Sequence, residues 1–395
     1  MELTKKQEAG LAEALTRYKN GEKYVTIAGY AGTGKTTLVR YIISALNVSE
    51  DSVVYCSYTG KAAEVLRKKG NKNAMTLHKL LYDSIPKPGG GFIRRPKMNV
   101  EYDIVVVDEI SMAPKSMIEM LLKHKLFAIF LGDPGQLPQI DKNESHDYLQ
   151  HAHVFLDQVM RQAAESEIIQ LTMKIREGEN IPFTKGKEVM VLPRKELSTG
   201  HLIWADTILC ATNATRHGVN NQMRGLLGYD GVLQSGERII CKRNYWDDLN
   251  EDGDALVNGT IGIVKNPFES FVRIPAFIRN DRHDLPIITC DITPDGGKDF
   301  ISVDIDKDFL LTEASCVDWR VAYQIGKMKN KIGDILPRQI TYGYALTGHA
   351  AQGSEWDKVL TIEENFPFDR EEHKRWLYTA ATRAASRLVL VRQVD

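Results

Sequence analysis

The sequence is poor in the features that mark several large classes of protein. Its five cysteines are scattered over 395 residues without a Cys-x-x-Cys pair, which argues against structural zinc and for reduced thiols. No apolar run approaches the roughly 18–20 residues of a membrane-spanning helix, and the first residues are charged, unlike a secretory signal. We therefore expect a soluble, cytoplasmic protein without a membrane partner.

A strong charge of either sign is also missing. The formal net charge of −1 is not the basic balance typical of nucleic-acid-binding proteins, but a channel between lobes can be locally basic on a neutral chain. The composition, 43% hydrophobic and 26% charged, is ordinary for a globular protein, and the length predicts about two to three domains. No internal repeat or low-complexity tract is present.

Up to residue 150, short apolar runs alternate with helical patterns. The runs Lys23–Ala28, Ser52–Cys56, Asp103–Val107 and Leu126–Leu131 are continuous, as central parallel strands require. Residues 1–150 are therefore predicted to form an α/β lobe that binds a nucleotide. Within it, residues 82–100 are rich in proline and glycine and predict a small protruding hairpin or loop.

A second lobe is predicted over residues 151–236 and 337–395. Its expected strands are Thr207–Cys210, Gln339–Leu346 and Arg387–Arg392. Between them, residues 237–336 show short alternating runs separated by Gly, Asp and Asn, which predict an inserted antiparallel β-barrel. The expected strands of this insertion are Arg238–Cys241, Thr260–Val264, Pro286–Ile292 and Phe300–Ile305.

The segment Gly29–Thr37 (GYAGTGKTT) fits the phosphate-loop pattern G-x-x-x-x-G-K-[ST]. Its glycines let backbone N–H groups curl around phosphates, Lys35 neutralises them, and Thr36 can hold Mg²⁺. A chance match is the alternative reading, but the expected strand before the loop and the helix Thr37–Leu46 after it disfavour that reading, since a helix N-terminus adds its dipole to a phosphate site.

Two further segments follow expected strands. Asp108 and Glu109 end the run IVVVDE, so Asp108 is predicted to hold Mg²⁺ and Glu109 to polarise an attacking water; a polar strand end is the plain alternative. Gln136 lies in LGDPGQLP and is predicted to contact the γ-phosphate and a nucleic-acid groove, although Asp-Pro-Gly also suits a tight turn.

Arg383 ends the segment WLYTAATR, far along the chain from the phosphate loop. If Lys35 and Arg383 contact one nucleotide, ATP lies between two lobes, and its hydrolysis moves one lobe against the other. A surface ion pair is the alternative for an arginine taken alone.

In order along the chain, nine segments resemble the motif series of superfamily-1 helicases, most closely the RecD-like branch and the phage Dda type within it. The resemblance covers nearly the whole chain and is weakest over residues 244–336. The segments are LTKKQ, GYAGTGKTT, SYTGKAAEVL, TLHKLL, VVVDE, LGDPGQLPQ, VMRQ, YALTGHAAQGSEWD and LYTAATRA.

The resemblance implies two RecA-like lobes, ATP and Mg²⁺ as cofactors, and roles for single residues. Arg161 and Arg383 are similar to two arginines that the second lobe presents to the γ-phosphate, which in related sites change the rate by about 10³–10⁵. Ala350 stands where the family commonly has lysine, which removes a charged contact. The implied nucleotide-binding residues are Gln7 (adenine), Gly32, Thr33, Gly34, Lys35, Thr36, Thr37 and Glu355 (near the ribose).

The resemblance also implies a track for DNA. Hydroxyls, backbone amides and a lysine can bind phosphate oxygens, and such contacts position a strand without recognising its base sequence. The histidines taken alone are more often plain surface or core residues, and no ligand spacing suggests that they bind metal. The candidates are Thr59, Lys61, Thr76, His78, Thr347 and His349. Among aromatic side chains outside the expected core strands, Phe92, Tyr245 and Trp246 can stack on bases, with packing inside the inserted barrel as the equal alternative for Trp246.

The predicted function is an ATP-dependent DNA helicase that moves 5′-to-3′ on single strands. The alternatives are a DNA-stimulated ATPase that remodels protein–DNA complexes without separating strands, and a P-loop kinase. The resemblance further implies a hairpin pin carrying Phe92, an SH3-like insertion and a monomer. Its expected partners are single-stranded DNA, junctions, and single-strand-binding or replication proteins. It also implies a role in phage DNA replication in the host cytoplasm if a phage encodes the chain.

Overall fold

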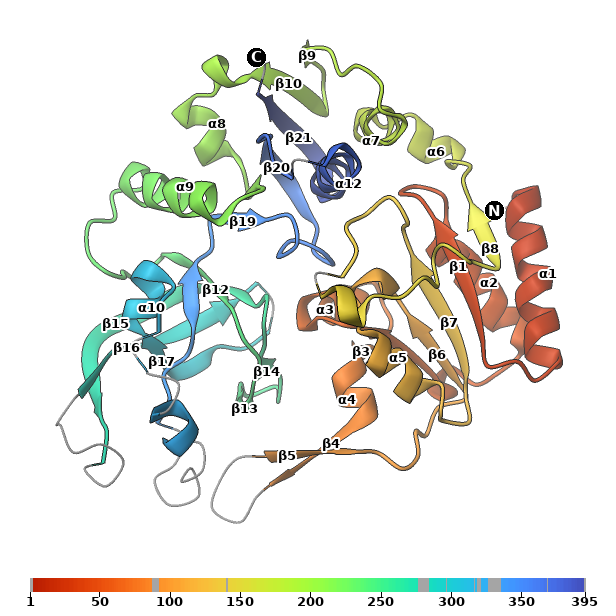
Figure 1. Ribbon diagram of the computed structural model, residues 1–395, viewed down its shortest axis with the longest axis horizontal. Coiled ribbons are helices and arrows are strands. Elements are labelled where there is room, and N and C mark those ends of the chain that lie inside the picture. The colour runs from red at the N-terminus through yellow and green to blue at the C-terminus, as the bar shows by residue number, and fades with distance from the viewer. Residues whose placement is uncertain are drawn as a thin grey trace. The chain divides into compact units, whose positions relative to one another are not determined.

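The computed structural model describes residues 3–86, 92–139, 141–275, 284–295, 297–315, 317, 321–325, 335–367 and 369–393. The chain forms two compact units (Figure 1). Unit 1 comprises Met1–Leu81, Lys97–Arg216 and Leu346–Asp395, and unit 2 comprises Tyr82–Pro96 and His217–Ala345. Among the helices in the described ranges, none has the length and apolar character needed to cross a bilayer.

Unit 1 contains a parallel six-stranded sheet in the order β3-β2-β6-β7-β1-β8. Every residue of β6 and β7 is buried, which explains why their sequences are continuously apolar. The four strands predicted for the first lobe are found within one residue at each end. The strands are β1 (Tyr24–Gly29), β2 (Val53–Ser57), β3 (Met75–Thr76), β6 (Ile104–Val107), β7 (Phe127–Gly132) and β8 (Val154–Leu156).

Helices cover this sheet and complete its core. The first helix begins at Thr4, whose hydroxyl accepts from the backbone N–H of Gln7 in a capping box. Its Ala14 joins Leu38 and Ile42 of the second helix in the core. The helices are α1 (Lys5–Lys19), α2 (Lys35–Leu46), α3 (Gly60–Lys68), α4 (Leu77–Leu81) and α5 (Lys115–Leu121).

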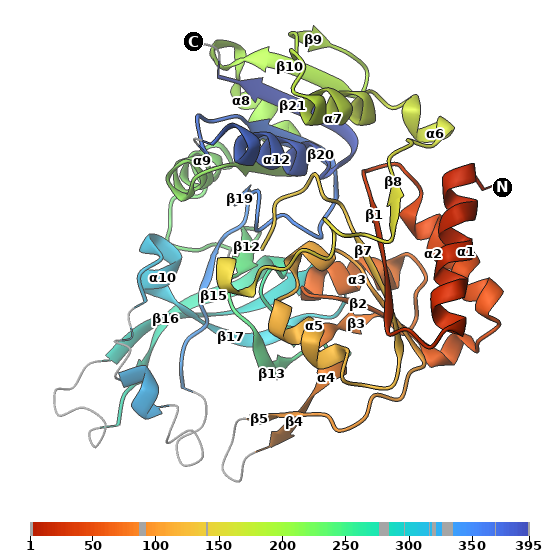
Figure 2. The same ribbon diagram turned by 45° about the vertical axis from the view of Figure 1, so that its right-hand side comes forward.

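A second six-stranded sheet has the order β19-β11-β20-β21-β10-β9, with β11, β20, β21 and β10 parallel and β9 antiparallel. Figure 2 shows α7 and α12 side by side against this sheet. The strands are β9 (Thr184–Lys185), β10 (Val189–Pro193), β11 (Thr207–Cys210), β19 (Ala345–Thr347), β20 (Trp356–Ile362) and β21 (Ala384–Arg392). The helices are α6 (Arg161–Ala164), α7 (Glu167–Glu177), α8 (Thr199–Trp204) and α12 (Arg370–Ala381).

The structure differs from the sequence prediction at the end of the first lobe and at the strand Gln339–Leu346. β8 pairs with β1, so the first sheet extends past residue 150, where the first lobe was predicted to end. The predicted strand Gln339–Leu346 is in fact two short strands, β18 (Ile340–Tyr342) and β19, which belong to different sheets. The break falls at Gly343, where a Cβ atom would lie 2.8 Å from the Ile239 backbone, so glycine is required by close packing.

Unit 2 is built on an antiparallel sheet in the order β17-β16-β15-β12-β18. β12 has the predicted bounds, whereas β15 continues beyond Val264 with side chains that are mostly exposed. The alternation of apolar residues in β15 therefore ends before the strand pairing does. The remaining elements are α9 (Asn213–Leu226), β12 (Arg238–Cys241), β13 (Tyr245–Leu249), β14 (Ala255–Leu256), β15 (Ile261–Arg273), β16 (Asp284–Pro294), β17 (Phe300–Asp306) and α10 (Lys307–Thr312).

Unit 2 also holds a two-stranded hairpin, β4 (Tyr82–Pro86) and β5 (Phe92–Pro96), within the segment predicted to form a hairpin or loop. Its register pairs Tyr82 with Pro96 and Pro86 with Phe92. The backbone of Phe92 thus lies at the end of β5 nearest the connection, and its side chain lies outside the described residues.

A charged cluster joins the elements of the second sheet. The Glu363 carboxylate lies 3.2 Å from His373 Nε2 and accepts from Arg392 Nε at 2.8 Å. The hydrogen bond to Glu363 raises the pKa of His373. Burial favours neutral Glu363, but hydrogen bonds from His373 and Arg392 outweigh burial and lower its pKa.

This cluster predicts a pH-dependent stability. Because the folded-state pKa of His373 is raised, its contribution is fully present below about pH 6.5 and is lost as the pH rises through the folded pKa. His373→Gln is therefore expected to cost about 1 kcal/mol at pH 5.5 and less at pH 8. Urea unfolding at both pH values measures this difference. His151→Gln, which removes an exposed pair with Asp147, is the control, and an equal loss at both pH values would contradict the assignment.

Candidate nucleotide-binding site

The phosphate loop connects β1 to α2 in unit 1, as predicted. Gly32 and Gly34 have φ values of 73° and 79°, a left-handed conformation that side chains with a Cβ atom rarely adopt. Lys35 begins α2, and its Nζ donates to the carbonyls of Gly29 at 2.7 Å and Tyr30 at 3.0 Å. The loop therefore curls around the lysine head group at the N-terminus of a helix, where anions bind favourably.

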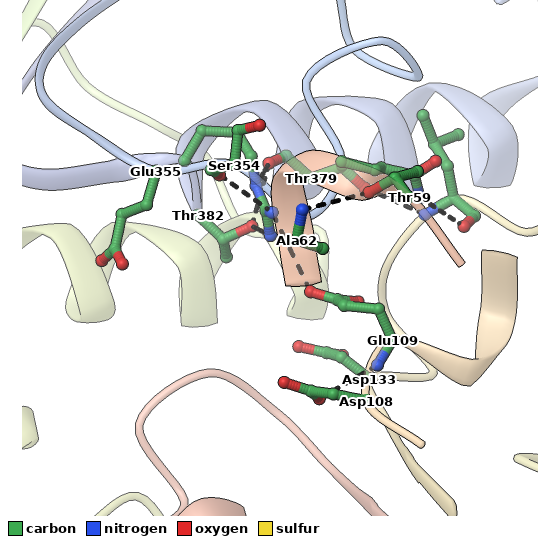
Figure 3. A network of polar contacts seen from close by, with 12 residues as sticks. Thr59, Ala62, Asp108, Glu109, Asp133, Ser354, Glu355, Thr379 and Thr382 are labelled. Carbon is green, nitrogen blue, oxygen red and sulfur yellow. Dashed lines mark hydrogen bonds and ion pairs between the residues drawn. The ribbon is translucent and has the colours of Figure 1, made fainter. Parts of the chain in front are cut away.

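Acidic side chains lie near this lysine at the carboxyl ends of β6 and β7. Burial and then Glu109 raise the pKa of Asp108, and Lys35 lowers it. Burial also raises the pKa of Asp133, which Lys35 again opposes. In Figure 3, Asp108 and Asp133 lie beside each other below Glu109. Lys35 thus acts electrostatically on both carboxylates.

Three of the predicted catalytic side chains meet. The Gln136 amide, oriented to satisfy both neighbours, donates to Glu109 Oε2 at 3.1 Å and accepts from Arg383 Nη2 at 3.1 Å. Arg383 Nη1 lies 3.9 Å from Glu109 Oε1. Glu109 and Gln136 follow strands of the first sheet, and Arg383 follows α12 of the second. Side chains from both sheets therefore share one group of contacts.

Arg383 is held rigidly in this position. Its Nε donates to Thr379 O at 3.1 Å and its Nη1 to Ser354 O at 3.3 Å, and the residue is 6% exposed. Glu109 adopts φ 51°, which is unusual for a side chain other than glycine. A buried, fixed guanidinium thus faces a carboxylate on a strained backbone.

Gln7, predicted to read adenine, is 1% exposed and lies against the phosphate loop. Its Oε1 accepts from Thr4 N at 2.9 Å, and its Nε2 is 3.5 Å from the carbonyls of Thr33 and Gly34. Its amide therefore caps α1 and braces the loop, and a role toward adenine stays a prediction.

The segment of Arg161 also contacts the loop. Met160 N donates to Gly32 O at 2.9 Å, and Arg161 opens α6 directly afterwards. The side chain of Arg161 lies outside the described residues. The backbone thus carries Arg161 next to Gly32, while its contact with phosphate stays a prediction.

Thr33 is buried and its hydroxyl donates to Tyr30 O at 2.8 Å, whereas the other predicted nucleotide-binding residues are less constrained. Thr36 is exposed in the first turn of α2, and Thr37 follows it half-buried. Glu355 points away from the acidic group in Figure 3, and its Oε2 lies 3.6 Å from Lys69 Nζ. The structure therefore places Glu355 in an exposed ion pair, and its role near the ribose stays a prediction.

Sequence reasoning did not single out two residues that link the loops. The Tyr378 hydroxyl accepts from Ala31 N at 3.0 Å and donates to Asp133 Oδ2 at 2.7 Å. Both residues lie inside recognised segments, LYTAATRA and LGDPGQLPQ, but nothing in either segment indicates that they pair. The loop of Gln136 is held further by Thr379 and Gln352, which bond Leu137 N and Leu137 O at 2.9 and 2.8 Å.

The residues predicted to contact DNA phosphates lie in unit 1, where Thr76 ends β3 and Thr347 ends β19. Thr59 caps α3, its hydroxyl accepting from Ala62 N at 3.2 Å (Figure 3). Close to this cap, a Cβ on Gly353 would lie 2.7 Å from Ala62 Cβ, so the segment of Thr347 and His349 approaches that of Thr59 and Lys61.

The remaining members of the predicted track are partly engaged. Lys61 Nζ lies 3.4 Å from Glu64, and the ring of His78 is 5.6 Å from that of Tyr58. Thr76 is buried and accepts from Lys79 N at 3.2 Å. Burial lowers the pKa of His349, which favours its neutral form. DNA contacts by these residues stay predictions.

Tyr245 differs from the sequence interpretation. It was proposed to stack on bases, but its hydroxyl accepts from Gln339 N at 2.6 Å and Arg338 Cζ lies 5.0 Å from its ring centroid. The ring is therefore occupied inside unit 2. The side chain of Trp246 lies outside the described residues.

The donor set at the end of β6 fits Mg²⁺. Asp108 offers a carboxylate whose Oδ1 already accepts from Glu109 N at 2.9 Å, and Thr36 offers an exposed hydroxyl in the first turn of α2. Mg²⁺ prefers oxygen ligands, commonly one or two protein groups together with substrate phosphates. These two residues would hold the ion.

The fold and these contacts define a P-loop protein in which a second parallel sheet supplies an arginine to the acidic site. Two family models match, an AAA domain over residues 2–189 and a UvrD-like helicase C-terminal domain over residues 342–391. The chain is thus similar to superfamily-1 helicases of the RecD-like branch, which confirms the resemblance predicted from the sequence.

Comparisons with individual proteins give the same result. The ATP-dependent RecD2 DNA helicase of Deinococcus radiodurans is 26% identical over 97% of this chain and 49% of its own length. The ATP-dependent DNA helicase dda of Enterobacteria phage T4 is 26% identical over 38% of this chain and 35% of its own. The chain therefore spans half or less of these curated relatives. The structure of Bacteroides Pif1 helicase with ADP-AlF3 and ssDNA matches over 100% of this chain and 94% of that one, with TM-score 0.54 and 17% identity, a likeness in fold.

Proposed function

We propose that the protein is an ATP-dependent DNA helicase that translocates 5′-to-3′ on single-stranded DNA and separates duplexes. The observation that carries this proposal is the contact of Glu109, Gln136 and Arg383. These groups come from the carboxyl ends of β6 and β7 and from the end of α12. A change at the γ-phosphate therefore alters contacts made from both sheets, as a translocating ATPase requires.

Hydrolysis needs a base, charge stabilisation and a fixed phosphate. Glu109 is the base for the attacking water, and Gln136 and Arg383 meet the charge that develops on the γ-phosphate. Lys35 leaves the loop carbonyls to bind phosphate oxygens, and Arg161 is proposed as the second arginine. Bound Mg²⁺ would neutralise charge between the β- and γ-phosphates, with Asp108 and Thr36 as its protein ligands.

In this proposal the two parallel sheets are the RecA-like lobes, and unit 2 carries the accessory elements. Lobe closure over ATP moves the DNA-contacting segments of Thr59 and His349 relative to each other. Those contacts bind phosphate and tolerate any sequence. Opening one base pair costs about 1.4 kcal/mol, so a small wedge suffices once the ATPase supplies direction.

Direction is the first test. We expect efficient separation of a duplex that carries a single-stranded tail on the 5′ side, and little separation with a 3′ tail alone. The expectation rests on the RecD-like resemblance and on an insertion of antiparallel strands in place of a helical one. A fluorescent strand-separation assay on both substrates measures it. Separation from the 3′ tail alone would overturn the polarity and leave the ATP-site roles unaffected.

The alternative is a DNA-stimulated ATPase that remodels protein–DNA complexes without unwinding. ATP turnover that rises with DNA while both tailed duplexes stay intact would favour it. Turnover indifferent to DNA would instead favour a P-loop kinase, which has no use for Arg383. Stimulation by single-stranded RNA as strong as by DNA would widen the substrate class.

Phe92 is proposed to lie where the duplex splits, on the hairpin β4–β5. Phe92→Ala is then expected to reduce unwinding several-fold, because the wedge is lost, while DNA-stimulated ATPase and single-strand translocation stay near wild type. Ile93→Ala, one residue further along β5, is the matched control. Equal losses in all three assays would identify Phe92 as a packing residue.

The proposal extends to partners and setting. We propose that the protein acts as a monomer on single-stranded DNA and junctions, in the cytoplasm or, if a phage encodes it, in the host cytoplasm. A place in phage DNA replication and contacts with single-strand-binding or replication proteins follow from the Dda likeness. Sedimentation with and without a forked DNA tests the monomer.

A further inference from the structure

Tyr378 bridges two segments that belong to the first sheet, although it lies on α12 of the second. Its hydroxyl accepts from the N–H of Ala31 in the phosphate loop at 3.0 Å and donates to Asp133 Oδ2 at 2.7 Å. Tyr378 is 1% exposed and Asp133 2% exposed, so water does not compete for these bonds. One hydroxyl thus serves both segments.

The surroundings hold this hydroxyl in place. A Cβ atom on Gly135 would lie 3.1 Å from the Tyr378 ring, so the loop after β7 packs directly on the ring. Asp133 Oδ1 accepts from Gly135 N at 2.8 Å, which leaves Oδ2 for Tyr378. Burial and the charge of Asp133 raise the pKa of Tyr378, so the hydroxyl keeps its proton at neutral pH.

The neighbours of Tyr378 on the same chain segment reach the rest of the site. Thr379 accepts from Leu137 N, and Arg383 approaches Glu109 and Gln136. Of these contacts from one segment, the bond to Ala31 is the one that reaches the phosphate loop itself. Through Tyr378, α12 therefore contacts the backbone that would surround phosphate, independently of Arg383.

We propose that Tyr378 is a positioning residue that fixes the phosphate loop to the Asp133 loop and makes nucleotide affinity depend on the position of α12. The proposal rests on the nucleotide binding proposed above. It assigns to Tyr378 ground-state binding of the nucleotide, whereas Arg383 acts on turnover. Loss of the hydroxyl should therefore raise the nucleotide Kd much more than it lowers kcat.

The test compares Tyr378→Phe with wild type. Without nucleotide, hydrogen exchange of the segment 30–37 is expected to become about ten-fold faster, because Ala31 N–H loses its acceptor. With a fluorescent ATP analogue, Kd is expected to rise about ten-fold, the scale of one hydrogen bond to a charged partner. In an Asp133→Asn background the same change should have a smaller effect, because the two residues act through one bond.

Tyr344→Phe is the matched control. Tyr344 is 8% exposed, and its hydroxyl accepts from a backbone N–H, that of Arg238, at 3.3 Å. The substitution Tyr344→Phe should lower stability by a similar amount without changing hydrogen exchange in residues 30–37 or the nucleotide Kd. A lower melting temperature in Tyr378→Phe with unchanged exchange and Kd would overturn the proposal. A wild-type protein that neither binds nor hydrolyses ATP would contradict the proposed function. The hydrogen-exchange measurement would still test whether Tyr378 holds the phosphate loop.

Discussion

Lys35→Ala is expected to abolish ATP hydrolysis while leaving the affinity for single-stranded DNA without nucleotide largely intact. The ammonium group is the one that the phosphate loop surrounds through the carbonyls of Gly29 and Tyr30. Without it, phosphate charge at the loop is not neutralised. The segments proposed to contact DNA lie outside the phosphate loop, so they should keep their structure.

Steady-state ATPase and fluorescence anisotropy with a labelled oligonucleotide measure the two effects. Lys115→Ala is the control, since Lys115 is exposed on α5 and its Nζ lies 4.0 Å from Glu119 Oε1. Retention of more than about a tenth of the wild-type kcat corresponds to a loss below ~1.4 kcal/mol. That result would remove Lys35 from the role assigned to it.

Glu109→Gln is expected to bind Mg·ATP and turn it over about 10²–10⁴-fold more slowly, because the amide keeps the shape and loses the base. The contacts of Glu109 allow an effect on turnover to be separated from an effect on binding. The amide can still meet Gln136 and Arg383, so the site should stay assembled. Equilibrium binding of ATP and single-turnover hydrolysis separate the two effects.

Glu119→Gln removes an exposed carboxylate from α5 and serves as the control for Glu109→Gln. It should leave both binding and turnover unchanged. Normal turnover by Glu109→Gln would mean that another group activates the water. Loss of ATP binding would instead mean that Glu109 shapes the site, and the base would have to be sought elsewhere.

Local patterns in the sequence were sufficient to predict much of the fold. Buried parallel strands are apolar throughout, so β1, β2, β6 and β7 were predicted within one residue at each end. The phosphate loop and the acidic pair sit at strand ends, which a motif with its flanking elements identifies. The meeting of Glu109 with Arg383 was expected from the motif order rather than from any local signal.

Contacts between distant segments leave no such pattern. Tyr378 and Asp133 are 245 residues apart, and a tyrosine in an apolar helix segment reads equally well as core. The split of Gln339–Leu346 was missed because both halves are apolar, and the separation depends on the close approach of Gly343 to Ile239. Gln7 was recognised, yet its use in the capping box of α1 was not predicted, although the spacing Thr4-x-x-Gln7 is typical of that motif.

The backbone of Glu109 has a consequence for the evolution of this chain. A residue with a Cβ atom at φ 51° carries a local conformational cost of about 1–3 kcal/mol, which glycine largely avoids. Selection for heat resistance alone would therefore favour Glu109→Gly, the very change that removes the carboxylate. Libraries evolved for stability without an activity screen should drift toward inactive protein at this position, so thermostability and turnover have to be selected together.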